Sequence, residues 1–258
     1  MKKITLIIFF LLGTSFSLFA QITETDNTMF WTTLGVNKKL NDKFRISYYQ
    51  LHSLSLAEPR FNFIQPDLEL NYEINKKWDI AVSYTPTFSL DDVQGNQLIY
   101  HRVSADIKLS SKLGKRVRIR NSITAEQHFT QRSKFKQRYY YRFDIYYRNT
   151  KWPWRLRPFT TQKLYWYANG RDLQYYDASG NKTDLTSPDG LHAYRLKAGL
   201  KFYPSKDFNF SIYYQKQKEF NSGILGSRDI NSLNPNSNNI RRPFYDFSVI
   251  GVSCNYKL

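Results

Sequence analysis

The stretch RYYYRFDIYYR, from Arg138 to Arg148, decides the fold class. Its odd positions, from Tyr139 to Tyr147, hold aromatic or aliphatic residues, whereas most of its even positions are charged. Successive side chains of a β-strand point to opposite faces, so the segment predicts a strand with one apolar and one charged face. A helix would mix the two sets around its circumference.

The same alternation recurs in eleven runs, which cover residues 29–38, 44–54, 61–74, 78–88, 98–109, 116–129, 137–148, 155–167, 191–203, 208–220 and 244–258. Short turns and longer polar links separate these runs, and three of the turns open a repeated unit: Asn41-Asp-Lys-Phe44, Asn75-Lys-Lys-Trp78 and Ser205-Lys-Asp-Phe208. We therefore expect successive hairpins, with no helix and no second domain after the N-terminal segment.

The first twenty residues predict a Sec-type signal peptide. A basic start, Met1-Lys2-Lys3, precedes the apolar run from Ile4 to Leu12 and smaller residues up to Ala20. Cleavage near Ala20 would leave residues 21–258 as one domain. It would also lower the formal net charge from +17 to +15, because it removes two Lys residues. Export argues against nucleic acid as the partner of this basic chain.

The amino-acid composition excludes several other classes of protein. The chain has a single cysteine, Cys254, so neither a disulfide framework nor a cysteine-rich metal site is expected. Aromatic residues make up 17% of the 258 residues, which is unlike a disordered chain. No apolar run reaches the length of about 18 residues that a membrane-spanning helix needs.

Together these features predict an all-β fold, a transmembrane antiparallel up-and-down β-barrel that follows a cleaved signal peptide. A soluble sandwich or lipocalin-like barrel shows the same periodicity, but one with this many strands would enclose a very large apolar cavity. Bacterial single-chain barrels have even strand numbers, so the eleven runs predict about twelve strands, with residues 21–28 reaching the outer side first, or about ten as the alternative.

Several motifs resemble a known exported family. They are Trp31 at a strand start, QRYYYRFDIYYRN (residues 137–149), WRLRPF (154–159) and the closing FSVIGVSCNYKL (247–258). The pattern resembles the domain of unknown function 2490, a family of predicted outer-membrane barrels in Gram-negative bacteria. The resemblance implies a barrel fold and an outer-membrane location over nearly all of the mature chain. It implies no activity.

One pool of charge is expected inside the barrel, because an outward Arg or Lys at the membrane midplane costs about 2–4 kcal/mol. A lumen basic ladder on three consecutive strands comprises Arg116, Arg118, Arg120, Arg138, Arg142, Arg148, Arg155, Arg157 and Lys163. Expected acidic partners are Glu126 and Asp144 nearby, and Asp67, Glu69 and Glu73 from across a narrow barrel. Two interpretations stay open, a salt-bridged polar core and an Arg-lined lumen that attracts anions.

A second pool of charge lies at the short turns, which we expect to be periplasmic. Lys residues there adjoin the expected interface anchors Trp78, Trp152 and Trp154, a combination that suits anionic headgroups of outer-membrane lipids. We expect a monomer whose candidate solute is a small anion, with limited passage or binding in the basic lumen. We expect no cofactor and no metal site.

The alternative function is a lipid-modifying hydrolase, acting on phospholipid or lipopolysaccharide at the barrel rim. Its candidates are His128, Glu126 and Ser122 on one strand face. Residues two apart on a strand are separated by roughly 6.6 Å, too far for a direct orienting hydrogen bond. The nucleophile motif G-x-S-x-G is absent from the sequence. We therefore expect no enzymatic activity and assign no catalytic residue.

Overall fold

The computed structural model describes residues 28–56, 60–90, 97–129, 135–149, 152–176, 181–219, 232–233, 240–241 and 246–258. The predicted signal peptide and its cleavage near Ala20 lie outside these residues, as do most of residues 21–28 and of the link 221–243. In the described part of the chain, no helix is long and apolar enough to cross a membrane.

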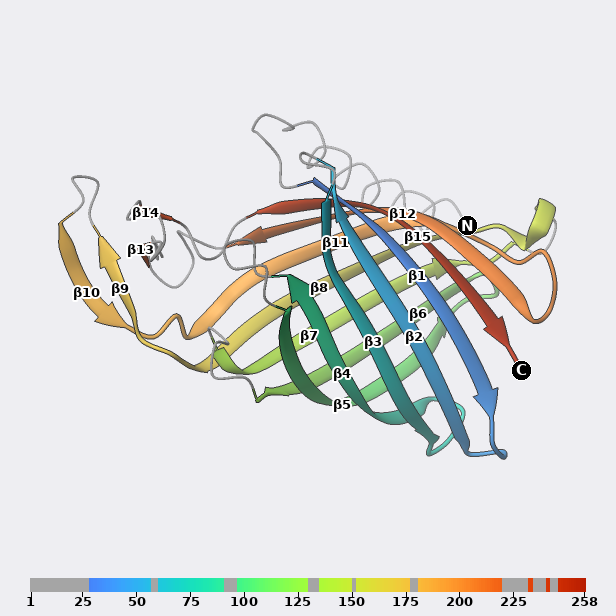
Figure 1. The fold of residues 1–258 in the computed structure, drawn as a ribbon. Coiled ribbons are helices and arrows are strands. Elements are labelled where there is room, and N and C mark those ends of the chain that lie inside the picture. The colour runs from blue at the N-terminus through green and yellow to red at the C-terminus, as the bar shows by residue number, and fades with distance from the viewer. Residues whose placement is uncertain are drawn as a thin grey trace.

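Eleven strands close into one barrel (Figure 1). They are β1 (Thr28–Lys39), β2 (Phe44–Ser55), β3 (Arg60–Glu73), β4 (Trp78–Leu90), β5 (Gln97–Leu113), β6 (Val117–His128), β7 (Phe135–Tyr147), β8 (Arg157–Gly170), β11 (Gly190–Phe202), β12 (Phe208–Glu219) and β15 (Phe247–Lys257). Consecutive barrel strands pair antiparallel, and each corresponds to one of the eleven alternating runs of the sequence. The predicted transmembrane β-barrel is confirmed.

The strand number differs from the expected twelve or ten. β1 pairs directly with β15, in parallel and over ten residue pairs from Thr28–Ser248 to Asn37–Lys257. In a meander of alternating directions the first and eleventh strands run the same way, so an odd barrel closes only through a parallel pair. With β1 already bonded to β15 on one side and β2 on the other, the barrel has no gap for a twelfth strand.

The short turns share a local hydrogen-bond pattern that explains the repeated sequence unit. The Asn41 side-chain oxygen accepts the backbone N–H groups of Lys43 and Phe44, at 2.9 and 2.8 Å. Asn75 and Ser205 accept in the same way from the residues two and three positions later. Such side-chain-to-backbone bonds replace a backbone turn bond, so these residues reverse the chain tightly.

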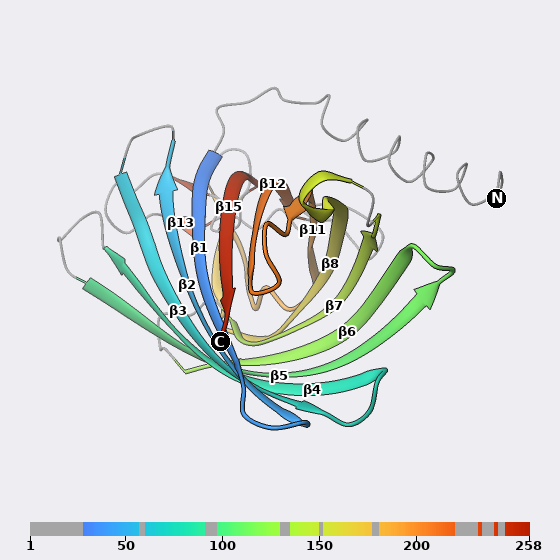
Figure 2. The ribbon, with the colours of Figure 1, turned by 90° about the vertical axis from the view of Figure 1, so that its right-hand side faces the viewer.

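The two barrel ends differ. In Figure 2 the viewer faces the end that carries the short turns and the C-terminus. The opposite end carries the longer links, where β9 (Leu173–Tyr176) and β10 (Lys182–Thr186) form a hairpin, and β13 (Ser232–Leu233) pairs with β14 (Ile240–Arg241). A 3-10 turn, η1 (Pro153–Arg155), joins β7 to β8 at the short-turn end.

Side chains alternate between the lipid-facing surface and the lumen in the predicted phase. On β6, Ile123 faces outward with 65% of its surface exposed, whereas its neighbours Ser122 and Thr124 are buried. On β7, Tyr141 faces outward and Asp144 is fully buried at 0%. Outward positions are mostly apolar and inward ones mostly polar, so the charge of the strands collects in the lumen.

Candidate functional site

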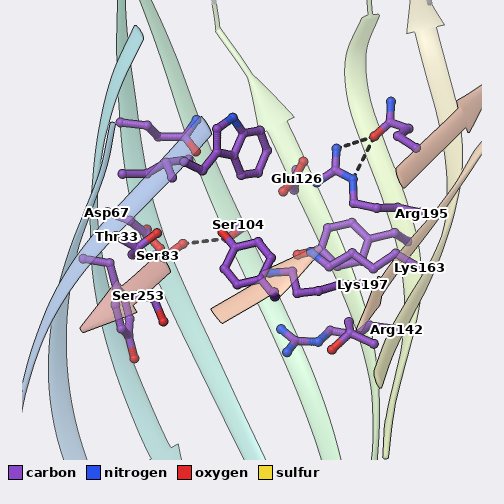
Figure 3. Close-up of a pocket in the computed structure, with 18 of the residues that line it drawn as sticks. Thr33, Asp67, Ser83, Ser104, Glu126, Arg142, Lys163, Arg195, Lys197 and Ser253 are labelled. Carbon is purple, nitrogen blue, oxygen red and sulfur yellow. Dashed lines mark hydrogen bonds between the residues drawn. The ribbon is translucent and has the colours of Figure 1, made fainter. Parts of the chain in front are cut away.

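The lumen contains a cavity of about 1070 Å³, lined by inward side chains from all eleven barrel strands. Figure 3 shows the central part of this lining. The positions of the charged side chains follow from strand register, because residues directly opposite each other on neighbouring strands have Cβ atoms about 4.5–5.5 Å apart.

Four basic residues form what we call the cationic cluster: Arg142, Lys163, Arg195 and Lys197. Arg142 on β7 is the register partner of Lys163 on β8, and Lys163 is the register partner of Arg195 on β11. Lys197 lies two residues further along β11 and therefore on the same face. The four side chains occupy one wall of the lumen, on the right in Figure 3.

Only one member of the cluster has a carboxylate partner among the described residues. Arg142 donates to Asp144 at 2.9 Å. Arg195 donates through Nε and Nη2 to the neutral side-chain oxygen of Gln217. The Lys163 ammonium lies 4.3 Å from the Tyr140 ring centroid and the Lys197 ammonium 4.2 Å from that of Tyr213. Cation–π contacts stabilise an ammonium without neutralising its charge.

The facing wall carries carboxylates. Asp67 and Glu69 on β3 line the cavity together with Asp106 on β5. Lys108 pairs with Glu69 at 3.1 Å and with Asp106 at 3.6 Å. Asp67 accepts a hydrogen bond from Thr85 at 2.9 Å, and no ion pair involves it in the described part of the chain. The lumen is therefore basic on the β7–β8–β11 side, whereas the β3–β5 side holds carboxylates together with Arg60, Arg102 and Lys108.

A smaller cavity of about 230 Å³ joins the two walls. From the cationic side it is lined by the whole cluster with Thr161, Tyr213 and Gln215. From the other side it is lined by Trp31, Thr33, Tyr49, Leu51, Gln65 and Asp67. Asp67 and the cationic cluster thus face the same small space.

A second group of charged side chains surrounds Glu126. This residue is buried, and its carboxylate lies 2.5 Å from Arg138, 3.7 Å from Arg102 and 3.5 Å from the His128 ring. Two arginines satisfy this carboxylate, so the group is a compact structural ion pair rather than a free charge.

Only some residues of the predicted basic ladder line the cavity. Arg120, Arg138, Arg142 and Lys163 line the cavity. Arg116, Arg118 and Arg148 are exposed near the short turns and outside its lining, and Arg157 stacks on Tyr203 at 4.1 Å.

The lumen placement of Arg155 is wrong. Arg155 ends the η1 turn with φ 48°, and its guanidinium donates to the backbone oxygen of Ser205 at 2.7 Å. This hydrogen bond links the turn before β8 to the turn after β11, and Arg155 does not belong to the strands that line the lumen. Trp154 has the same left-handed backbone, with φ 49°.

Likewise, only some of the predicted acidic partners form ion pairs with the basic ladder. Asp144 pairs with Arg142 and Glu126 with Arg138, each close to its partner in sequence or register. Glu69 pairs with Lys108 instead of reaching the ladder, and Glu73 is exposed at the end of β3. Among the described residues, no ion pair crosses from β3 to β6, β7 or β8. The expectation that Asp67, Glu69 and Glu73 pair with the ladder across the lumen is therefore wrong. The cavity between the two walls is not bridged by an ion pair of these residues.

Sequence reasoning missed Arg195 and Lys197. Their signal was present, because the odd positions of the run 191–203 include Arg195, Lys197 and Lys201. The long link between the two runs hid the fact that β11 neighbours β8 and extends the basic wall.

The three predicted anchors lie at the short-turn end and are exposed: Trp78, Trp152 and Trp154. Trp152 packs against Tyr147, with ring centroids 5.5 Å apart, and Trp154 lies edge-on to Phe202 at 6.2 Å. Amphipathic aromatic rings at this level are typical of a membrane interface.

Comparison with known proteins places the chain in a family. No curated protein matches it. Among solved structures, it is similar to LpxR from Salmonella typhimurium, with 11% identity over 83% of each chain and a TM-score of 0.48. A likeness at that level carries no inference about activity. The family profile described as protein of unknown function (DUF2490) matches residues 28–226, which is more than half of the sequence. The chain belongs to this family of unknown function, and its fold is that of an outer-membrane β-barrel.

Proposed function

We propose that this protein is a non-enzymatic outer-membrane barrel of a Gram-negative bacterium that binds small anionic solutes in its lumen and allows their limited passage. The observation that carries the proposal is the cationic cluster. Three of its members, Lys163, Arg195 and Lys197, have no carboxylate partner among the described residues.

Electrostatics gives the reason. Adjacent like charges repel, and a lumen surrounded by protein and lipid screens them less than bulk water does. A wall with an excess of positive charge also attracts anions from solution. A small anion between Arg142, Lys163, Arg195 and Lys197 would relieve the repulsion and gain charge-assisted hydrogen bonds, which are roughly twice as strong as neutral ones.

The salt-bridged core and the anion-attracting lumen coexist under this proposal. The pairs of Glu126 with Arg138, Arg142 with Asp144 and Lys108 with Glu69 stabilise the barrel walls. The unpaired part of the cationic cluster is left to act on solutes. At the short-turn end, exposed Trp side chains and turn lysines support contact with anionic lipid headgroups, with these turns on the periplasmic side.

The alternative, a lipid-modifying hydrolase at the rim, gains no observation that favours it. His128 does lie within 3.5 Å of Glu126, closer than strand spacing alone suggests. The pair, however, is on the lumen face beside two arginines, whereas a lipid would arrive from the opposite face.

Planar-bilayer recording with the purified barrel tests the proposal. Under a salt gradient the wild-type protein should conduct with a preference for anions. Lys163→Gln combined with Arg195→Gln should reduce that preference, whereas Lys76→Gln combined with Lys77→Gln, in an exposed turn, should leave it nearly unchanged. Absent conductance, together with no anion binding by titration calorimetry in detergent, would contradict the proposal.

A further inference from the structure

We infer that the solute carries one ammonium group besides its anionic groups, as in an aminodicarboxylate. This inference rests on the proposed function and names the class of solute. The cationic cluster would hold the carboxylates, and Asp67, on the facing wall, would hold the ammonium group.

Asp67 is the first support. Its carboxylate lines the small cavity, where it accepts a hydrogen bond from the Thr85 hydroxyl at 2.9 Å. The neighbouring carboxylates Glu69 and Asp106 differ from Asp67, because both pair with Lys108. Asp67 lies opposite the cationic cluster (Figure 3), and no ion pair within 4 Å involves it in the described part of the chain.

The volume is the second support. The small cavity measures about 230 Å³. Pockets for drug-sized ligands measure roughly 300–1,000 Å³, so a compact ion is enough to fill this space. Asp67 and the cationic cluster line the same space, and a short solute could contact both at once.

The charge pattern is the third support. Three cations without a carboxylate partner face one carboxylate without a cation across this cavity. A simple dianion would satisfy the cations but would stand opposite Asp67 and be repelled by it. A solute with two carboxylates and one ammonium satisfies both walls. Trp31 and Leu51 line the cavity beside the polar groups and can contact its short aliphatic stem.

Titration calorimetry of the detergent-solubilised full chain tests this, with glutamate and glutarate as matched probes that differ only in the ammonium group. Wild-type protein should bind glutamate about tenfold more tightly, because a charge-assisted hydrogen bond is gained and a repulsion is removed. Asp67→Asn keeps an acceptor for Thr85 but removes the charge. It should abolish the preference by weakening glutamate and strengthening glutarate.

Asp79→Asn is the matched control, because Asp79 lines the large cavity but not the small one. It should leave the ratio of the two affinities unchanged. Equal binding of the two probes by the wild type, or an unchanged ratio in Asp67→Asn, would overturn this inference and leave anion binding intact. Should Asp67→Asn not fold, the wild-type ratio alone decides. Absence of binding by either probe, with a lumen that still conducts anions, would overturn the inference as well.

Discussion

Lys163 and Arg195 face each other as register partners on neighbouring strands β8 and β11, and no carboxylate pairs with either among the described residues. Like charges directly opposite each other on a sheet are destabilising. The barrel therefore retains an arrangement that costs stability, beside the small cavity of its lumen. Such a cost is typical of a functional site, where binding and stability compete.

Lys163→Gln should consequently stabilise the empty barrel. Removing one charge of the opposed pair should raise the free energy of unfolding by about 0.2–1 kcal/mol at low salt. Added salt should reduce the gain, because it screens the repulsion in the wild type. Denaturant unfolding in detergent micelles, followed by tryptophan fluorescence, measures both effects.

Lys108→Gln provides the control with opposite sign. Lys108 pairs with Glu69 and Asp106, so its loss leaves two carboxylates without their cation. This variant should be less stable than the wild type. Destabilisation by both substitutions to a similar extent would mean that Lys163 is held by an attraction, and the repulsive interpretation would fail.

Asp144 is expected to be the most sensitive charged position. It is fully buried, accepts from Thr161 at 2.5 Å and from Arg142 at 2.9 Å, and is the carboxylate of the basic wall. Asp144→Asn should lower the free energy of unfolding by about 1.5–3 kcal/mol, because a hydrogen bond to a charged group is lost and Arg142 is left unpaired. Thr161→Val, which removes one neutral donor, should cost only about 1 kcal/mol. A similar loss in the two variants would contradict the role given to the charge.

Gly251 is expected to be required beneath the Tyr213 ring. The two are register partners on β15 and β12, and a Cβ at Gly251 would lie 2.2 Å from Cζ of Tyr213. Gly251→Ala should therefore displace the ring from the Lys197 ammonium and cost about 1–3 kcal/mol through overpacking. In a Tyr213→Ala background the same substitution should cost much less. A double-mutant cycle of unfolding free energies measures the coupling, and additive losses would refute it.

Much of this fold was readable from the sequence because alternation is a local signal. The alternation in segments such as Arg138–Arg148 indicates which face of the strand contacts lipid. The structure agrees, because Tyr141 is exposed on the outer face and Asp144 is buried on the inner face. The turns were readable for the same reason, since Asn41, Asn75 and Ser205 each hydrogen-bond to residues two and three positions later.

The features that the sequence did not predict depend on contacts between residues that are distant in sequence. Arg195 joins the basic wall only because β11 returns beside β8 after the link that contains β9 and β10. Arg155 leaves the wall because the η1 turn adopts positive φ and reaches the Ser205 carbonyl. The strand number itself is a property of closure, and an alternating pattern cannot report whether the first and last strands meet in parallel.

That closure can be tested with the native cysteine. Leu34 on β1 is the register partner of Cys254 on β15 in the parallel pair. Neighbouring strands lie about 4.8 Å apart, within the range of Cα separations that a disulfide bridges. Leu34→Cys should therefore cross-link to Cys254 under mild oxidation and shift the unfolded protein on a gel. Val36→Cys, whose partner is Tyr256, lies two residues further along and should react far less. A twelfth strand inserted between β1 and β15 would separate Leu34 from Cys254 by about 10 Å, so absence of the Leu34→Cys cross-link in the folded barrel would contradict the eleven-stranded closure.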